Sequence, residues 1–314
     1  MVGKVSLLRP PAIQSGAKIA VVSPASSAKA ERITRGIERL RELGYEVAAS
    51  PHAYGRQAPY FAGTPEERIE DLHTAFRDPE IAAIFCTRGG YGSNYLLEDL
   101  DLDLIRSHPK PFFAYSDLTT VQTWLLDQAG LVAFHGPMVA ADFAVENGVD
   151  QSSFAAACNG GQVEAGPQQG LRILRPGRAR GVMYGGCLSI LTAALGTHFT
   201  PQTEGKLLFL EDVGTKPYQI DRMLRQMVLA GKFDGVSGFI FGEMLDCVSP
   251  GAHPDLVEQV ILRVLDWFDG PIAIGLRSGH VSGGNVTLPM GIEAELMLED
   301  QPSLHYAEAA VRTG

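Results

Sequence analysis

Short, nearly continuous apolar runs alternate with segments of helical periodicity along the first half of the chain. Residues 18–23 and 81–86 are apolar runs of the kind that form strands buried on both faces of a parallel sheet. Residues 28–43 carry apolar side chains at helical spacing, and Gly44 behind them is a typical helix stop. The repeated strand–helix–strand order therefore predicts a parallel sheet with helices on its faces.

A second region of the same kind follows a break in the pattern. Residues 144–180 are rich in turn-forming residues and hold only short apolar pieces. Beyond them strand-like runs alternate again with helical segments, and these runs are residues 206–210, 238–241 and 272–274. We therefore expect an α/β protein of two domains. The expected parts are an N-terminal α/β domain over 1–165, a linker over 166–180 and a C-terminal α/β domain over 181–314.

Composition and charge narrow the class of protein. The 314 residues are 45% hydrophobic and 20% charged, which is typical of a globular chain. The 26 Lys and Arg against 36 Asp and Glu give a net charge of −10, and such a surface repels phosphate backbones and anionic headgroups. We therefore expect neither nucleic acid nor a membrane as partner. Four cysteines without CxxC spacing and a start without a secretory signal indicate reduced thiols in a cytoplasmic protein.

The first loop with candidate chemistry follows the predicted strand at residues 112–115. Ser116 stands between this strand and a predicted helix, and such an elbow exposes a hydroxyl beside backbone N–H groups. The alternative is that Ser116 or Asp117 only caps the helix, since no GxSxG pattern surrounds the serine. Both interpretations stay open on spacing alone.

A second loop, residues 88–92, is rich in glycine and follows the strand-like run 81–86. Glycines let a backbone approach a ligand closely, and a helix start favours an anion. A dinucleotide fingerprint is a poor fit, because Tyr95 stands where the third glycine belongs and no acidic residue lies in 110–114. A plain tight turn remains the alternative to a functional loop.

The remaining candidates are acids and histidines that follow later strands. Glu211 and Asp212 come directly after a buried run, where a carboxylate needs a partner, although a capping Asp212 and an exposed Glu211 are the alternative. His280 stands in a glycine-rich loop over 275–291, suited to acid–base work, and His135 is the second histidine candidate. The order Ser116, Glu211, His280 is one of several that form a serine triad. The sequence has no HExxH motif and no Asp/His cluster at ligand spacing, so we do not expect a metal site.

Six short blocks in order along the chain resemble the serine-type LD-carboxypeptidases, the family of murein tetrapeptide carboxypeptidases and microcin-immunity peptidases. The blocks are Arg88-Gly89-Gly90-Tyr91-Gly92, Tyr115-Ser116-Asp117-Leu118-Thr119, His135-Gly136-Pro137-Met138, Gly185-Gly186-Cys187-Leu188-Ser189, Leu210-Glu211-Asp212-Val213 through Tyr218-Gln219-Ile220-Asp221-Arg222-Met223-Leu224, and Gly279-His280 through Leu288-Pro289-Met290-Gly291. The resemblance runs in family order from Ile19 to Leu296, nearly the whole chain.

The resemblance implies a role for each matching residue. Ser116 would be the nucleophile, His280 the general base and acid, and Glu211 the carboxylate that orients His280. The oxyanion hole would come from the N–H of Asp117 and one from the Gly89–Gly90 loop, with Gly90 as the expected donor. The implied fold is a flavodoxin-like or class I amidotransferase-like nucleophile domain followed by an α/β domain that carries the Glu and the His. Members of the family are typically cytoplasmic homodimers without a metal or other cofactor.

The substrate is less well defined than the reaction. We expect the free carboxylate of a small peptide to be received by Arg88 with Gly89, and next by Arg277. Cys187 stands where the family pattern has Asn, and Gln219 where Arg is common, which leaves the substrate open.

We predict a serine carboxypeptidase that releases the terminal D-alanine of murein tetrapeptides during cell-wall recycling. The alternatives are the same triad acting on a microcin-like aminoacyl-nucleotide conjugate, and a catalytically silent muropeptide-binding protein. A nucleotide-dependent α/β enzyme would need the glycine and the acid that are missing after residue 88.

Overall fold

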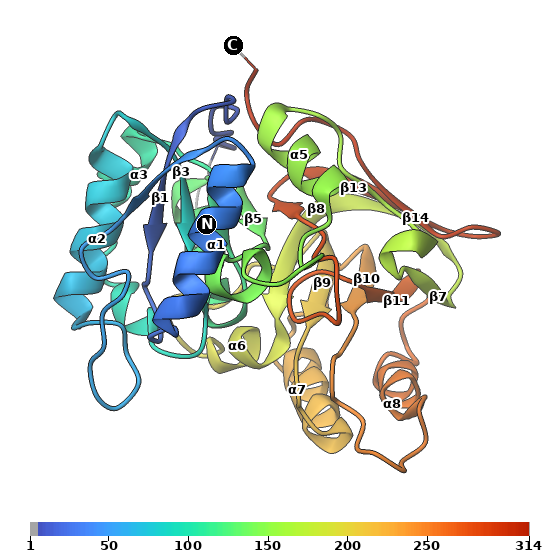
Figure 1. Cartoon of the computed structure of the whole chain (residues 1–314). Coiled ribbons are helices and arrows are strands. Elements are labelled where there is room, and N and C mark those ends of the chain that lie inside the picture. Colours follow the sequence, from blue (N-terminus) through green and yellow to red (C-terminus); the bar gives the residue numbers. More distant parts are fainter. Residues whose placement is uncertain (1–5, 314) are drawn as a thin grey trace.

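The computed structural model describes residues 6–313 and arranges them in two β-sheets with helices packed around them (Figure 1). The first sheet has six strands in the order β12–β5–β4–β3–β1–β2. Their bounds are β1 (Lys18–Val22), β2 (Glu46–Ala49), β3 (Ile81–Cys86), β4 (Phe112–Ala114), β5 (Ala133–His135) and β12 (Leu288–Met290). All neighbours pair in parallel except β12, which lies antiparallel to β5. The parallel sheet predicted from the first half of the chain is therefore confirmed.

The elements of this half follow the predicted pattern closely. Strands β1 and β3 are buried along almost their whole length, as expected of strands covered on both faces. Helix α1 (Ala30–Glu42) buries one apolar stripe and is followed by Gly44 at φ +94°, a backbone conformation that glycine adopts without strain. Helix α2 (Pro65–Arg77) begins at a capping box, in which Thr64 and Glu67 exchange side-chain and backbone hydrogen bonds.

The second sheet has eight strands in the order β6–β14–β13–β8–β9–β10–β11–β7. Their bounds are β6 (Glu164–Ala165), β7 (Arg172–Arg175), β8 (Gly177–Cys187), β9 (Lys206–Glu211), β10 (Gly238–Gly242), β11 (Ile272–Leu276), β13 (Glu293–Leu298) and β14 (Ser303–Tyr306). The four central strands β8 to β11 pair in parallel, and the outer strands are antiparallel. The other helices are α3 (Leu102–Ser107), α4 (Thr119–Trp124), α5 (Gln151–Asn159), α6 (Leu188–Ala193), α7 (Pro217–Leu229) and α8 (Leu256–Val264).

The segment expected to be a linker, residues 166–180, instead includes β7 and the start of β8. These strands lack a continuous apolar run because β8 begins with alternating exposed and covered positions. Arg178 and Arg180 point outward there and pair with Glu299 and Glu293. Strand β12 also returns from the C-terminal part of the chain to the first sheet. The division into two domains is thus less sharp in the structure than along the sequence.

One hydrophobic core joins the two sheets. Phe113 and Phe134 of the first sheet lie in the same buried cluster as Met183 and Phe209 of the second. A packed core of this kind is rigid and holds the loops at the strand ends in fixed relative positions. The carboxyl ends of β3, β4, β9 and β11 lead directly into the four loops that carry the candidate residues.

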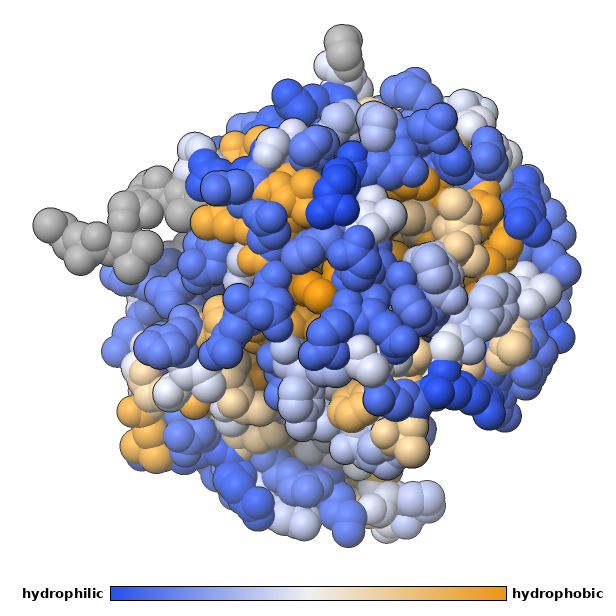
Figure 2. Space-filling model, turned by 90° about the vertical axis from the view of Figure 1, so that its left-hand side faces the viewer, coloured by the Kyte–Doolittle hydropathy of each residue, from blue (hydrophilic) through white to orange (hydrophobic). Residues whose placement is uncertain are grey.

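The surface carries mainly polar side chains. Figure 2 turns toward the viewer the side on which α2 and α3 lie in Figure 1, and this face is largely hydrophilic with interspersed apolar patches. Within residues 6–313 no helix has the length and apolar character needed to cross a membrane. All four cysteines are buried and free of disulfides in the structure.

Candidate functional site

Ser116 lies on a sharp turn between β4 and helix α4. Its backbone φ is +65°, a left-handed conformation that costs a residue with a Cβ atom about 1–3 kcal/mol. A short 3₁₀ turn, Ser116–Leu118, begins at the serine and leads into α4. The Ser116 side chain is partly exposed, whereas Tyr115 and Asp117 on either side are buried. The predicted elbow is therefore present, and the strained backbone is the kind found at functional turns.

The glycine loop after β3 lies directly against this turn. A Cβ atom placed on Gly89 would lie 2.7 Å from Ser116 Cβ, 2.9 Å from Ser116 Oγ and 3.1 Å from the backbone N of Asp117. Gly90, at φ +108°, lies instead against Ser26. The structure thus brings Gly89, rather than Gly90, into contact with the serine, and only a residue without a side chain fits there.

Glu211 and His280 form a hydrogen-bonded pair. Glu211 ends β9 and is fully buried, and its Oε2 accepts from His280 Nδ1 at 2.7 Å and from the His280 backbone N at 3.1 Å. Burial by itself lowers the pKa of His280, but the Glu211 charge and hydrogen bond outweigh it, so the pKa lies above its usual value. Burial by itself raises the pKa of Glu211, but the nearby His280 outweighs it, so the pKa of Glu211 lies below its usual value. Each partner favours the charged form of the other.

Asn285 holds the loop that carries His280 through two hydrogen bonds to Gly279. Asn285 accepts from Gly279 N through Oδ1 and donates through Nδ2 to Gly279 O, both at 3.0 Å. The same Nδ2 donates to Asp142 Oδ1 at 3.0 Å, and Asp142 Oδ1 also accepts from the Tyr115 hydroxyl at 3.3 Å. Burial raises the pKa of Asp142 to about 6. This network ties the histidine loop to the residue just before Ser116.

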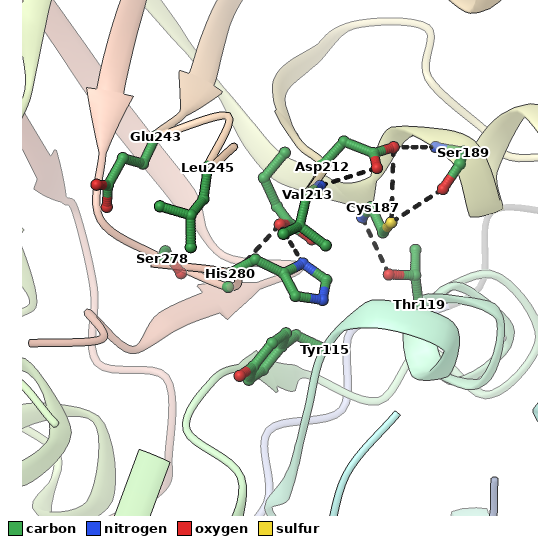
Figure 3. A network of polar contacts seen from close by, with 12 residues as sticks. Tyr115, Thr119, Cys187, Ser189, Asp212, Val213, Glu243, Leu245, Ser278 and His280 are labelled. Atoms are coloured by element: carbon green, nitrogen blue, oxygen red, sulfur yellow. Dashed lines mark hydrogen bonds and ion pairs between the residues drawn. The ribbon is translucent and has the colours of Figure 1, made fainter. Parts of the chain in front are cut away.

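Residues from the two halves of the chain lie opposite each other at the site, with Tyr115 and Thr119 facing His280 and Cys187 (Figure 3). The Tyr115 ring lies edge-on to the His280 ring with centroids 5.2 Å apart. The Thr119 hydroxyl at the start of α4 accepts from the Cys187 backbone N at 3.1 Å, which links the first sheet's helix to β8. Among the described residues the Ser116 hydroxyl makes no hydrogen bond to His280. Catalytic hydrogen bonds commonly close only when substrate is bound.

Of three further residues singled out from the sequence, Arg277 and Gln219 lie apart from this arrangement and Cys187 lies within it. Arg277 donates to Gln168 O through its guanidinium and to Gln169 O through its backbone, so its side chain is engaged by another loop. Gln219 lies in the first turn of α7, where its Oε1 accepts from Lys216 N at 3.0 Å. Cys187 is buried beside Glu211, with which it is in register between β8 and β9.

Unlike Arg277, Arg88 has a guanidinium that is not engaged by another part of the described chain. Its side chain is exposed, and within residues 6–313 its guanidinium makes no hydrogen bond or ion pair. It follows β3 and precedes the glycine that contacts Ser116. Arg88 therefore presents an uncompensated positive charge next to the serine loop.

A cavity of about 610 Å³, a volume suited to a ligand the size of a short peptide, reaches the serine turn at Asp117, whereas Ser116, His280 and Arg88 do not line it. Its walls come from both halves of the chain and include Tyr91, Tyr95, Glu98, Asp117, His198 and Phe199. Neither tryptophan lines it: Trp124 is buried in the core, and Trp267 is exposed behind α8.

These groups together suit acyl transfer. A histidine bonded through Nδ1 to a buried carboxylate leaves Nε2 to take a proton, and the elbow presents a hydroxyl beside backbone N–H groups. Within residues 6–313 no set of three or more His, Cys, Asp and Glu side chains is arranged to hold a metal ion.

Comparison with known proteins agrees with this chemistry. Residues 19–136 match the LD-carboxypeptidase N-terminal domain, and residues 180–296 match the LD-carboxypeptidase C-terminal domain. The chain is 35% identical to the probable murein peptide carboxypeptidase of Bacillus subtilis over 98% of this chain and 96% of that protein. It belongs to the LD-carboxypeptidase family. Membership identifies it as an enzyme of the carboxypeptidase class and confirms the resemblance read from the six blocks.

Two further proteins are similar to this member of the LD-carboxypeptidase family. The crystal structure of an MccF-like protein from Bacillus anthracis covers 96% of this chain and 99% of its own with a TM-score of 0.88 at 28% identity. The microcin C7 self-immunity protein of Escherichia coli is 27% identical over 89% of this chain and 89% of its own. The predicted α/β fold is therefore confirmed.

Sequence reasoning missed the residues that support the pair. Asp142 and Asn285 lie far apart along the chain, and neither stands in a pattern that suggests a partner. The one available signal was an acid within the apolar stretch 139–143, because a buried carboxylate needs a donor.

Proposed function

We propose that this LD-carboxypeptidase family member removes the terminal D-alanine from murein tetrapeptides by a Ser116–His280–Glu211 mechanism. The observation that carries the proposal is the 2.7 Å hydrogen bond between His280 and the fully buried Glu211, beside the strained turn of Ser116. A murein peptide substrate is supported by the name of the B. subtilis relative.

In the proposed mechanism the Ser116 hydroxyl attacks the carbonyl carbon of the scissile amide and gives its proton to His280 Nε2. The backbone N–H of Asp117 and one from the Gly89–Gly90 loop would stabilise the oxyanion. The C–N bond then breaks, His280 returns the proton to the leaving amine, and D-alanine departs. Water, deprotonated by the same histidine, releases the acyl group from Ser116.

Two features support recognition of a peptide carboxylate and stem. The free guanidinium of Arg88 suits the terminal carboxylate of the substrate, since guanidinium binds carboxylates through paired hydrogen bonds. The cavity of about 610 Å³ beside Asp117 is large enough for the remaining residues of a tetrapeptide. Arg277 is the weaker candidate for this role, because its guanidinium is already engaged by Gln168.

A second candidate substrate is an aminoacyl-nucleotide conjugate. It is favoured by the similarity to the microcin C7 self-immunity protein. An aromatic platform for a base could come from Tyr91 or Tyr95, whereas neither tryptophan is available at the cavity.

D-alanine release from a murein tetrapeptide tests the proposal directly. We expect release by the wild type in the presence of EDTA, none by Ser116→Ala, and full activity in Ser107→Ala, whose serine is exposed on α3. No release by the wild type, with Ser116 still labelled by a fluorophosphonate, would overturn the substrate and favour the conjugate. A wild type that neither releases D-alanine nor is labelled at Ser116 would favour a muropeptide-binding protein.

We also propose a cytoplasmic site of action and a homodimer. The family resemblance supports both, and four buried thiols that form no disulfide support the cytoplasmic site alone. Sedimentation of the purified protein tests the dimer.

A further inference from the structure

Asp117, which follows the serine turn, is fixed at two points by one residue, Ser93. The Ser93 backbone N donates to Asp117 Oδ2 at 2.8 Å, and the Ser93 hydroxyl lies 2.7 Å from Asp117 O. Ser93 is fully buried and Asp117 is 3% exposed, so water does not compete for these bonds. Ser93 therefore holds both the side chain and the main chain of Asp117.

The direction of each hydrogen bond follows from the groups present. The Ser93 hydroxyl lies 2.7 Å from Asp117 O and also 2.7 Å from Thr120 Oγ1. A carbonyl oxygen only accepts, so Ser93 gives its single proton to Asp117 O, and Thr120 donates to Ser93 Oγ. The reverse order would leave Ser93 Oγ and Asp117 O at 2.7 Å with no proton between them, and Thr120 would have to reach Asp117 O at 3.2 Å.

Ser93 is itself anchored from the other side. The carbonyl of Gly92, the residue before it, accepts from Arg68 Nη1 at 2.8 Å. The same Nη1 donates to Pro24 O at 2.8 Å, in the loop that follows β1. Arg68 is only 1% exposed, and hydrogen bonds from a charged donor are stronger than those between neutral groups. Ser93 is thus a fixed point against which Asp117 is held.

The turn that Ser93 contacts needs support from its surroundings. Ser116 has a left-handed backbone, and a residue with a Cβ atom keeps this conformation only where neighbouring contacts enforce it. Asp117 follows Ser116 directly, so bonds to the Asp117 carbonyl and carboxylate restrict the rotation of the peptide that joins the two residues. Within residues 6–313 the N–H of that peptide donates to no acceptor. It is therefore available to a substrate.

We propose that Ser93 is a positioning residue, which holds Asp117 through both bonds so that the turn keeps its shape and the Asp117 N–H stays free for the oxyanion. This inference rests on the proposed function, in which that N–H is an oxyanion donor. Ser93 takes no part in proton transfer, because its one proton is used on Asp117 O.

The first test removes the bond to the carbonyl. In Ser93→Ala the Thr120 proton becomes free for Asp117 O at 3.2 Å, so Ser93→Ala is combined with Thr120→Val and compared with Thr120→Val alone. We expect kcat for D-alanine release to fall about tenfold and KM to change less than about twofold. This loss is smaller than the roughly 10²- to 10³-fold that follows removal of a whole oxyanion donor, because the N–H is misaligned rather than absent.

Fluorophosphonate labelling of Ser116 should slow by a similar factor, since the phosphoryl oxygen of the reagent takes the place of the oxyanion. The pH midpoint of labelling should not move, because Ser93 has no contact with His280 or Glu211. The control is Ser237→Ala, which removes a hydroxyl-to-carbonyl hydrogen bond of 2.9 Å before the start of β10. It should lose stability and keep the wild-type labelling rate per folded molecule.

The second test concerns the bond to the carboxylate. Asp117→Asn and Asp117→Ala both remove the negative charge, but only asparagine keeps an oxygen that accepts from the Ser93 backbone N. A difference between the two variants is therefore due to the hydrogen bond. We expect the alanine variant to be labelled about tenfold more slowly than the asparagine variant.

Thermal unfolding of each variant gives the folded fraction, so that rates are compared per folded molecule. Labelling does not depend on the natural substrate, so a wild type that is labelled without releasing D-alanine refutes the proposed substrate but still tests Ser93. Equal labelling rates with and without Ser93→Ala on the Thr120→Val background would overturn the proposal. If the Ser93 variant unfolds, equal rates in Asp117→Asn and Asp117→Ala would overturn it. A wild type that neither is labelled nor releases D-alanine would overturn both this proposal and the proposed function.

Discussion

The turn that carries Ser116 and the pair formed by Glu211 and His280 are built by different physical means. Backbone geometry makes the first: a serine at φ +65° and a glycine whose missing side chain lets two loops touch. Burial and charge make the second: a fully buried carboxylate with an imidazole at 2.7 Å. Substitutions at the serine turn should therefore act through shape, and substitutions at the Glu211–His280 pair through proton affinity.

The largest expected effect is on the charged side. Glu211→Gln keeps the volume of the side chain but removes the negative charge that stabilises protonated His280. We expect kcat/KM for D-alanine release to fall roughly 10³- to 10⁴-fold, as for other triads that lose their carboxylate. Glu299→Gln, which changes an exposed glutamate of a surface ion pair, serves as the control and should leave kcat/KM unchanged. A loss of less than tenfold in Glu211→Gln would contradict the account of the pair.

An intermediate effect is expected on the backbone side. Gly89→Ala would place a methyl group within 2.9 Å of Ser116 Oγ and 3.1 Å of the Asp117 N, so one of them must shift. We expect a loss of about 10²-fold in kcat, the size of effect seen when one oxyanion donor is removed. The control is Gly283→Ala, since a Cβ atom there meets nothing within 4 Å. Equal activity of the two alanine variants would show that the close contact has no catalytic consequence.

The smallest effect concerns stability. Ser116→Gly removes the Cβ atom from a left-handed backbone position, whereas Ser116→Ala keeps it. Both variants lose the hydroxyl, so both should be inactive. We expect the glycine variant to have a free energy of unfolding about 0.5–1 kcal/mol higher than the alanine variant, after the greater freedom of glycine in the unfolded chain is counted. Denaturant titration of the two proteins measures this, and a less stable glycine variant would mean that the turn carries no strain.

The sequence predicts those elements of the fold that depend on residues close together along the chain. Continuous apolar runs indicated β1, β3, β9 and β10 correctly, because strands buried on both faces need apolar side chains throughout. Strand β8 was missed because its first residues alternate between exposed and partly covered positions, and the exposed ones are arginines whose glutamate partners come from much later in the chain. Such cross-strand pairs become visible only when the strands are side by side.

The same limit applies to the site. Ser116, Glu211 and His280 could be singled out, since each stands at the end of an apolar run or in the loop after one. The pairing of Glu211 with His280, and the approach of His135 to the other carboxylate oxygen, depend on two sheets packed on one core. The spacing of residues along the chain does not predict how the two sheets pack.

In the proposed mechanism the buried Glu211–His280 pair, which the second sheet holds, activates the serine that follows a strand of the first sheet. The most direct measurement is the rate of fluorophosphonate labelling at Ser116 as a function of pH, in wild type and in Glu211→Gln. Neutral His280 is the active base and Glu211 raises its pKa, so the wild-type rate should rise with pH through a midpoint above the usual histidine value of 6.5. In Glu211→Gln the largest contribution that opposes burial is lost and only Asp212 and Asp142 still raise the His280 pKa, so we expect the midpoint to shift to lower pH than in wild type, with a much lower plateau. Labelling of Ser116 with the same midpoint and plateau in both proteins would contradict the account.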